Sequence, residues 1–461
     1  MAVAPVTSLY SGENQAGKYP EAWVKKVSSY RWNWRGFRRG FWAAVIGGLF
    51  LIGVRSPRPD QTSEDFHSLA IARDHLFDFV DWEVSAFSDK LSTGALGPQI
   101  FMTEHERSQL VRDYFALVGE ISRLEDEVEA LYASPDISNP DAASLPLRQQ
   151  RDVLRARQSD QQALVEAIIQ EQISEILVEH GFGIGGQVIP PVQMRFTQLP
   201  TLLVLSPRDH IERTGSYPLE HGLTVERQEQ IEADVASSLG TSSLIVPLGG
   251  LAVYPAMMIE TSNLAFAFEV AAHEWSHHYL TFFPLGVSYG TTPELYTMNE
   301  TAANIVGKEV GWEVLTRYYP DLAPPPPDYT PQPAEVAPAP GPSEAPTFDF
   351  RAEMHQTRVH VDELLAQGRI AEAEAYMEAR RRVFLENGYR IRKINQAYFA
   401  FYGSYADVPG YGGTDPIGPA IRELRYYSHS LTDFVNRVRG ITTVAELNAA
   451  LAIARQGSSD G

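Results

Sequence analysis

The clearest pattern of hydrophobic and polar positions in this chain is a heptad seam between residues 110 and 131. Its apolar positions alternate with spacings of four and three: Leu110, Tyr114, Leu117, Ile121, Leu124, Val128 and Leu131. This spacing predicts a helix that packs along a second helix. Residues 150 to 179 supply the apolar positions of a partner, and a Pro- and Asn-containing segment between them predicts a loop. We therefore expect a coiled-coil helical hairpin over residues 60 to 182, interpreted as a stalk or spacer.

From about residue 183 the long helical periodicity gives way to short aliphatic segments. Aliphatic segments such as "TLLVLSP" (201 to 207) and "SSLIVPLGG" (242 to 250) are bounded by Gly and Pro, which predicts short strands and turns. A small sheet is thus expected before a longer apolar stretch at 264 to 287. The expected fold class is α+β and predominantly helical.

A proline-rich segment divides the second half of the chain. Residues 323 to 346 contain ten prolines, which exclude a helix and favour an extended linker, assigned to residues 323 to 347. A ligand for an SH3-type domain is the alternative interpretation of such a segment. The C-terminal region, 348 to 461, has helical spacing. It can either fold back onto the preceding region or form a unit of its own.

The N-terminal region combines basic and aromatic residues. A basic tail, residues 1 to 40, precedes an uncharged run at 41 to 54. Fourteen residues make a helix of about 21 Å, which is short for a ~30 Å hydrocarbon core, so a cleaved signal or a soluble helix stays an alternative. The flanking Trp and Arg residues favour a single-pass transmembrane signal-anchor in the cell membrane. The excess of Lys and Arg before the run predicts a cytoplasmic N-terminus and an extracytoplasmic main region.

Composition narrows the possible partners and metals. The net charge of −20 and the pI near 5.0 argue against a nucleic-acid partner, because phosphate binding depends on clustered Lys and Arg. The chain has no cysteine, which excludes disulfides, cysteine zinc sites and cysteine nucleophiles. Any metal ion must therefore be held by His and carboxylate side chains.

The stretch "FEVAAHEWSHHYLTF" (268 to 282) contains the motif H-E-x-x-H. Side chains four apart lie on the same face of a helix, so His273 and His277 could bind one metal ion with Glu274 beside them. A third ligand is expected downstream, and Glu300 begins a segment with helical spacing and small residues. His278 lies off the ligand face, so a structural role is expected for it.

H-E-x-x-H followed by N-E-x-x-A resembles the gluzincin zinc metallopeptidases, which include thermolysin-like proteases and several zinc aminopeptidases. The resemblance covers residues 264 to 311. It implies a zincin-like catalytic core, assigned to residues 183 to 322, with an edge strand beside the metal. The gap between His277 and Glu300 is twenty-two residues. This is longer than is usual for gluzincins, and a Pro- and Gly-containing loop insertion accounts for it.

The same resemblance implies a role for each motif residue. His273, His277 and Glu300 would bind one Zn²⁺, and Glu274 would act as the general base. Asn304 stands where thermolysin-like enzymes have an aspartate that supports a ligating histidine, so it is the expected hydrogen-bond partner of a ligand. Together these residues predict hydrolysis of a peptide or protein substrate by zinc-activated water. The choice between endopeptidase and aminopeptidase stays open.

Two questions remain after the motif is assigned. The residue that stabilises the oxyanion is not selected by spacing among the candidates Tyr398, Tyr402, Tyr405, Tyr426, Tyr427 and His429. The alternative function is a non-catalytic, membrane-anchored scaffold, in which the hairpin and the linker organise partners and the metal is structural or absent. An intramembrane protease is excluded, because only one candidate span is present.

Overall fold

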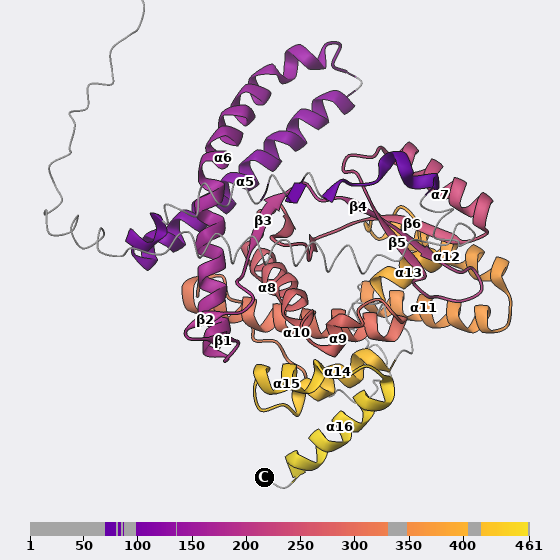
Figure 1. Ribbon diagram of the computed structural model, residues 1–461. Coiled ribbons are helices and arrows are strands. Elements are labelled where there is room, and N and C mark those ends of the chain that lie inside the picture. The colour runs from indigo at the N-terminus through magenta and orange to yellow at the C-terminus, as the bar shows by residue number, and fades with distance from the viewer. Residues whose placement is uncertain are drawn as a thin grey trace, which may run out of the picture. The chain divides into compact units, whose positions relative to one another are not determined.

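The computed structural model describes residues 70–79, 82–83, 86, 98–134, 136–330, 348–403 and 416–459. These residues form a mostly helical α+β structure with small sheets (Figure 1). No helix of the described part is both long and apolar enough to cross a membrane. The basic tail, 1–40, and the expected anchor, 41–54, lie outside the described residues. Two short 3-10 turns, η1 (Arg73–His75) and η2 (Pro98–Phe101), precede the first long helix.

The expected hairpin corresponds to two long helices, α5 (Glu104–Ala133) and α6 (Pro140–Glu179), which lie side by side (Figure 1). Hydrogen bonds join early residues of α5 to late residues of α6, and later residues of α5 to earlier ones of α6: Glu104 with Gln172, Glu120 with Gln150, and Glu125 with Arg155. The two helices therefore run antiparallel. A capping box at Thr103 and Glu106 starts α5, and the side chain of Asn139 caps α6.

The base of this hairpin belongs to the main hydrophobic core. Buried residues of both hairpin helices pack in one cluster with residues of the later helices α8 (Leu264–Leu280) and α10 (Pro293–Tyr318): Phe115, Val118, Ile169, Ile173, Phe268, Trp275 and Ile305. The interpretation as a stalk therefore does not extend to this end of the hairpin. Beyond it, the apolar positions Val128 and Leu131 of the seam are only partly buried.

An antiparallel sheet follows, with β4 (Thr201–Ser206) between β5 (Gly215–Leu219) and β6 (Ser242–Pro247). The connection between β5 and β6 contains α7 (Val225–Leu239), which packs Ile231 and Val235 against one face of this sheet. The two faces of β4 lie in different hydrophobic clusters, Leu202 and Val204 in one and Leu203 and Leu205 in the other, so β4 is buried from its second residue onward.

A second sheet leads directly to the motif helix. Its central strand, β8 (Ala256–Ile259), is parallel to β3 (Met194–Thr197) and antiparallel to the edge strand β7 (Gly250–Leu251). A small hairpin, β1 (Gly183–Ile184) and β2 (Gln187–Val188), precedes β3. Because β8 ends only a few residues before α8 begins, the sheet fixes where the motif helix starts.

Polar side chains of α6 close the outer edge of β3. Glu166 accepts a hydrogen bond from the backbone N–H of Phe196 (2.9 Å), and Gln170 accepts one from the N–H of Met194 (3.1 Å). Gln162 donates to the carbonyl oxygen of Phe196 (2.7 Å). The three side chains are spaced four apart on one face of the helix and replace a neighbouring strand. The other edge of this sheet is β7.

Three helices carry the motif and its surroundings: α8 (Leu264–Leu280), α9 (Pro284–Val287) and α10 (Pro293–Tyr318). The side chain of Asn263 caps α8, and that of Thr292 caps α10, with a proline in the first turn of α10. The loop insertion expected between the histidines and Glu300 is therefore a short helix, α9, with a turn on either side.

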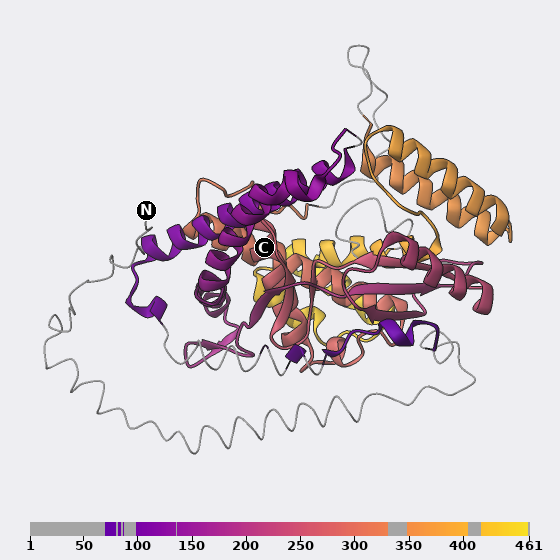
Figure 2. The ribbon, with the colours of Figure 1, turned by 90° about the horizontal axis from the view of Figure 1, so that it is seen from above.

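The C-terminal region does not form a unit of its own. Part of it packs on the sheet of β4 and β6, and the rest packs on the main hydrophobic core. Two helices, α11 (Phe350–Ala366) and α12 (Ile370–Glu386), lie side by side (Figure 2) and pack with α13 (Gln396–Tyr402) into a cluster with β4 and β6. The last helices join the core of α8 and α10: α14 (Ile417–Tyr426), α15 (Leu431–Val438) and α16 (Val444–Ser459). Of the proline-rich linker, residues 323–330 are described and have no regular structure.

Candidate metal centre

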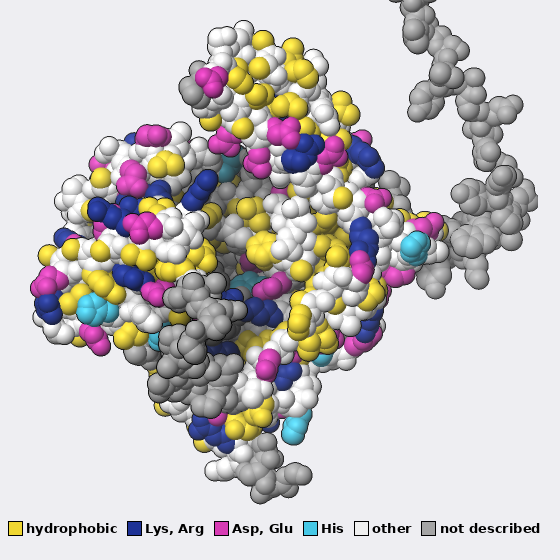
Figure 3. All heavy atoms as spheres, turned by 180° about the vertical axis from the view of Figure 1, so that it is seen from behind, with side chains coloured by type: hydrophobic (Ala, Val, Ile, Leu, Met, Phe, Trp, Pro, Cys, Tyr) yellow, Lys and Arg dark blue, Asp and Glu magenta, His cyan; other side chains and the backbone are white. Residues whose placement is uncertain are grey.

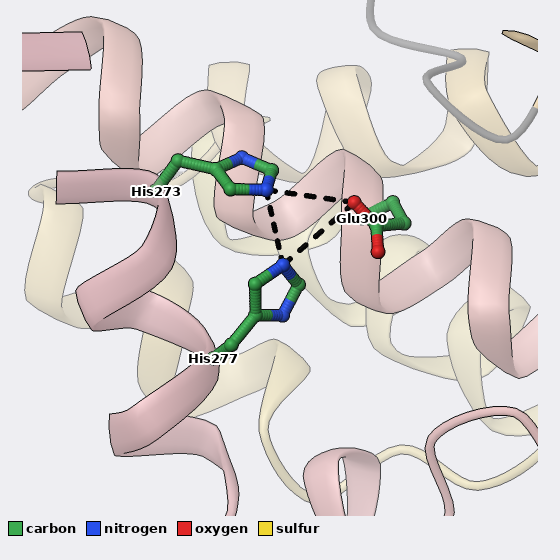
Figure 4. A group of neighbouring side chains, drawn as sticks. All are labelled: His273, His277 and Glu300. Carbon is green, nitrogen blue, oxygen red and sulfur yellow. Dashed lines mark hydrogen bonds and ion pairs between the residues drawn. The ribbon is translucent and has the colours of Figure 1, made fainter. Parts of the chain in front are cut away.

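The two histidines of the motif point in the same direction from α8. His273 and His277 are one turn apart, and their Nε2 atoms lie 3.0 Å from each other (Figure 4). Their side chains are only 11% and 12% exposed. The helix therefore presents two imidazole nitrogens at one nearly buried point.

The third side chain comes from α10. Oε2 of Glu300 lies 3.5 Å from Nε2 of His273 and 3.7 Å from Nε2 of His277 (Figure 4). The ligand atoms of these three residues all lie within 4.8 Å of one another, and this is a group that could hold a metal ion. The structure thus brings together the three residues that the sequence analysis expects as metal ligands.

Two glycines allow α10 to approach α8 this closely. A Cβ atom on Gly307 would lie 2.7 Å from the carbonyl oxygen of Glu269 and 3.0 Å from Cβ of His273. A Cβ on Gly311 would lie 3.0 Å from the backbone nitrogen of Glu269. Because the contacted atoms are mostly backbone, larger residues at these two positions would push the helices apart. The sequence analysis noted small residues in this segment but did not identify these glycines.

The distances fit a tetrahedral zinc ion. Zinc bonds to imidazole nitrogen and carboxylate oxygen are about 2.0–2.2 Å long, so tetrahedral ligand atoms lie about 3.4 Å apart. The three separations of 3.0, 3.5 and 3.7 Å surround this value. In addition, Oε2 of Glu300 is fully buried and makes no hydrogen bond. A buried carboxylate oxygen without a donor is costly, and a cation between it and the histidines would remove that cost.

Asn299 contacts the ring nitrogen of His277 that faces away from the candidate metal position. Its Oδ1 lies 2.8 Å from Nδ1 of His277, and its Nδ2 donates to the carbonyl oxygen of Leu285 (3.3 Å). This contact places the proton of His277 on Nδ1 and leaves Nε2 free to bind a cation. The sequence analysis expected this role for Asn304, which lies one turn further along α10 and is partly buried. Its contribution stays a prediction.

Burial and neighbouring charge shift the pKa values at this centre. Burial alone would lower the pKa of His277, but the carboxylate of Glu300 outweighs it and raises this pKa to about 9. Burial would raise the pKa of Glu300, but the charge of His277 and the contact with His273 hold this pKa well below its ordinary value. In the metal-free protein His277 therefore carries a second proton, whose charge balances the ionised carboxylate of Glu300. A metal ion must displace that proton.

Glu274 lies against the edge strand β7. Its side chain is buried, and burial raises the pKa of its carboxyl group. A Cβ atom on Gly250 would lie 2.3 Å from Oε1 of Glu274, so the absence of a side chain at this position makes room for the carboxylate. The general base expected from the motif thus sits between the helix that carries the histidines and the edge of a sheet.

A tyrosine that the sequence analysis did not select lies at the centre. The hydroxyl of Tyr289 donates to Oε1 of Glu300 (2.5 Å), and its ring centroid lies 5.6 Å from that of His277. Burial and the charge of Glu300 raise the pKa of Tyr289 well above its ordinary value, so the hydroxyl stays protonated. The unusual length of the segment between His277 and Glu300 is the only sequence signal that points to this residue.

The residues weighed as oxyanion stabilisers have other surroundings. Tyr398 is buried in the aromatic core of α13, where Tyr402 packs against it. Tyr426 is about half exposed, and Tyr427 packs on the main hydrophobic core. The backbone N–H of His429 donates to Asp433 (3.0 Å). Tyr405 lies outside the described residues. These surroundings select none of the candidates as the oxyanion-stabilising residue.

His278 connects α8 to the turn that follows the edge strand β7. Its Nε2 donates to the carbonyl oxygen of Val253 (2.8 Å), and its ring packs edge-on against Tyr254 at 5.2 Å. Burial lowers the pKa of His278 to about 4, so the ring is neutral at physiological pH. Its contacts are those of a structural residue, as expected from its position off the ligand face.

One face of the molecule is hollowed. Figure 3 shows a hollow near the middle of this face, with histidine, acidic and basic side chains visible inside it. A recess with titratable groups at its floor is the usual setting of a binding or catalytic site.

No protein-family model matches this chain, and neither a curated protein nor a solved structure matches it. The resemblance to gluzincins therefore rests on the motif residues alone. Independently of that resemblance, the geometry gives a group of two histidines and one glutamate that could hold one metal ion.

Proposed function

We propose that this chain is a zinc-dependent peptidase with a zincin-like core, in which His273, His277 and Glu300 hold one Zn²⁺ and Glu274 is the general base. The observation that carries the proposal is the buried Oε2 of Glu300. It has no hydrogen-bond donor and lies 3.5 and 3.7 Å from two imidazole nitrogens. Three ligands on zinc leave a fourth position for water, which is the arrangement of catalytic zinc sites.

The chain's own residues supply the remaining chemistry. When bound, a zinc ion polarises a carbonyl group and lowers the pKa of water from 15.7 to about 7. Glu274 takes a proton from the attacking water and passes it to the leaving amine. The buried position of Glu274 raises its pKa, which makes the carboxylate a stronger base.

The edge strand β7 supports a peptide as the substrate. Gly250 pairs with Met258, and the N–H of Ile259 donates to the carbonyl oxygen of Gly249 (3.1 Å). Hydrogen-bonded and non-hydrogen-bonded pairs alternate in antiparallel strands, so Gly250 directs its own N–H and C=O away from β8. An extended peptide that paired with these groups would lie next to Glu274.

Zinc content and hydrolysis together test this function. The full chain should contain about one zinc per molecule after zinc-replete preparation, and it should cleave an unfolded protein substrate. Glu300→Ala should lose most of the zinc. Glu274→Gln is the matched variant: it should retain the zinc but lose at least about 10²-fold in turnover, the usual contribution of a general base. Zinc-free wild-type protein, or full turnover by Glu274→Gln, would contradict the proposal.

We further propose that residues 41–54 anchor the chain in the cell membrane, with a cytoplasmic N-terminus and an extracytoplasmic catalytic region. The support is the uncharged run and the excess of Lys and Arg before it. The protein should remain in the membrane fraction after an alkaline wash, and protease added outside intact cells should digest the main region. Release by the wash, or protection from the protease, would contradict this topology.

A further inference from the structure

The two oxygens of the Glu300 carboxylate have different surroundings. Oε1 accepts a hydrogen bond from the hydroxyl of Tyr289 (2.5 Å), whereas Oε2 makes no hydrogen bond and faces His273 and His277. The carboxylate is buried, with a side chain only 4% exposed. One donor therefore decides which oxygen of Glu300 is available to a cation.

Tyr289 reaches this carboxylate from outside the two motif helices. It lies in the turn between α9 and α10, where its backbone N–H donates to the carbonyl oxygen of Gly286 (3.2 Å). Gly286 itself lies directly on the end of α8, because a Cβ atom there would be 2.1 Å from the carbonyl oxygen of Leu280. The backbone N–H of Leu285 donates to the carbonyl oxygen of Arg439 (3.0 Å). The turn is thus held by α8 on one side and by the C-terminal region on the other.

The ring of Tyr289 is also held in place. It packs at 5.6 Å from the ring of His277 and at 5.0 Å from the ring of Tyr296. The residue as a whole is 42% exposed, and Tyr289→Phe keeps the packed ring and removes only the hydroxyl group. The long segment between His277 and Glu300 therefore places the hydroxyl group of Tyr289 at the carboxylate of Glu300.

We propose that Tyr289 is a positioning residue that holds Oε1 of Glu300, so that Oε2 alone binds the metal ion. This inference rests on the metal site of the proposed function, but not on the reaction catalysed there. A hydrogen bond to an ionised carboxylate is short and strong, and it competes with binding of the same oxygen to the metal. Tyr289 thereby keeps Glu300 a one-oxygen ligand and leaves room for water in the fourth position.

The test compares Tyr289→Phe with a matched variant, Tyr279→Phe. Tyr279 lies on α8 near the ligands, but its hydroxyl accepts a hydrogen bond from Arg439 (2.9 Å) and its ring packs on Trp275. The affinity of the full chain for Zn²⁺ would be measured by competition with a chelator. Tyr289→Phe should weaken zinc binding by roughly 10–100-fold, as loss of a partner of a metal ligand usually does, and Tyr279→Phe should not.

Two further readouts separate positioning from a general loss of structure. The visible absorption spectrum of the Co²⁺-loaded protein should change in Tyr289→Phe, because Glu300 can then bind through both oxygens. The circular dichroism spectrum of the metal-free variant should match that of the metal-free wild type, which would show that the fold is retained.

Three results would overturn the inference. Zinc affinity and a Co²⁺ spectrum unchanged in Tyr289→Phe would remove the role of Tyr289 and leave the metal site intact. Equal weakening in Tyr279→Phe would show that the effect is not specific to this hydroxyl. Absence of zinc binding in the wild type would overturn the metal site and this inference together.

Discussion

The molecule contains two helix pairs that are held together in different ways. The pair α5 and α6 packs through large apolar side chains such as Tyr114, Phe115 and Ile173. The pair α8 and α10 instead meets at Gly307 and Gly311, where backbone touches backbone. Large side chains hold helices 8–10 Å apart, whereas glycines permit closer approach. The comparison shows that apolar packing is common to both helix pairs, whereas the ligand geometry of α8 and α10 also depends on glycines at their closest approach.

The helices α8 and α10 also bury several titratable and polar side chains. The α8–α10 pair buries His273, Glu274, Asn299 and Glu300, and burial of such groups costs free energy unless each finds a partner. The apolar cluster that includes the base of the hairpin surrounds both helices. We infer that the burial of this shared apolar cluster offsets the free-energy cost of the buried polar side chains beside it.

The largest expected effect on stability comes from the hairpin. Ile121 of α5 is fully buried, so Ile121→Ala should lower the free energy of unfolding by roughly 2–5 kcal/mol. Zinc affinity of the folded variant should stay within about twofold of the wild type, because Ile121 does not position a ligand. Chemical denaturation and chelator competition measure the two quantities. A parallel loss of zinc affinity would show that the two helix pairs are not independent.

A substitution between α8 and α10 should lower zinc affinity as well as stability. Gly307→Val would place a Cβ atom 2.7 Å from a backbone oxygen of α8, which cannot move away easily. We expect a loss of about 3 kcal/mol in stability, at the upper end for overpacking, together with a drop of at least about tenfold in zinc affinity. Gly440→Val is the control, because an added Cβ at Gly440 meets no atom within 4 Å. Undiminished zinc affinity in Gly307→Val would refute the role of close helix approach.

The pH dependence of stability should report on His278. Its pKa is about 4 in the folded protein, below the ordinary value of 6.5. As pH falls from about 6.5 to 4, the unfolded chain binds a proton at this position before the folded protein does, so stability falls; above pH 6.5 the group contributes nothing. We expect a loss of about 2 kcal/mol across this window in metal-free protein.

The variant His278→Gln isolates this group from other titrating residues. A glutamine amide can still donate to the carbonyl oxygen of Val253 but does not titrate. The difference in unfolding free energy between wild type and variant should therefore change between pH 6.5 and 4 and be constant above pH 6.5. A difference that is the same at every pH would mean that His278 is not held neutral.

The smallest effect is expected at the junction between the pairs. Arg155 of α6 contacts Glu125 of α5 (2.9 Å) and Glu260 (2.6 Å), shortly before α8 begins. All three side chains are about one third exposed, so Arg155→Met should cost less than about 1 kcal/mol, with no change in zinc affinity. This loss of stability should be smaller in 1 M salt, because salt screens exposed ion pairs. A larger cost that is insensitive to salt would identify Arg155 as a packing residue.

Local patterns predicted more of the helices than of the contacts between them. The seam from Leu110 to Leu124 indicated α5 because burial on one helix face imposes a repeat that is visible in the sequence. The H-E-x-x-H spacing likewise placed His273 and His277 on one face. By contrast, spacing did not indicate the contact between Asn299 and His277, and the role that it indicated for Asn304 stays a prediction. Which amides of α10 reach the imidazoles depends on how this helix is rotated against α8.

The sequence by itself determined the elements and the chemical types at the centre: a mostly helical chain, short strands before the motif, two histidines one turn apart, and no cysteine. Only the tertiary structure decided how Gly307 sets the distance between the helices, how Gly250 makes room for Glu274, and that Tyr289 holds Glu300. The reason is physical. Periodicity records which face of an element is buried, whereas contacts between distant segments depend on the packing of the whole core and leave no repeat in the sequence.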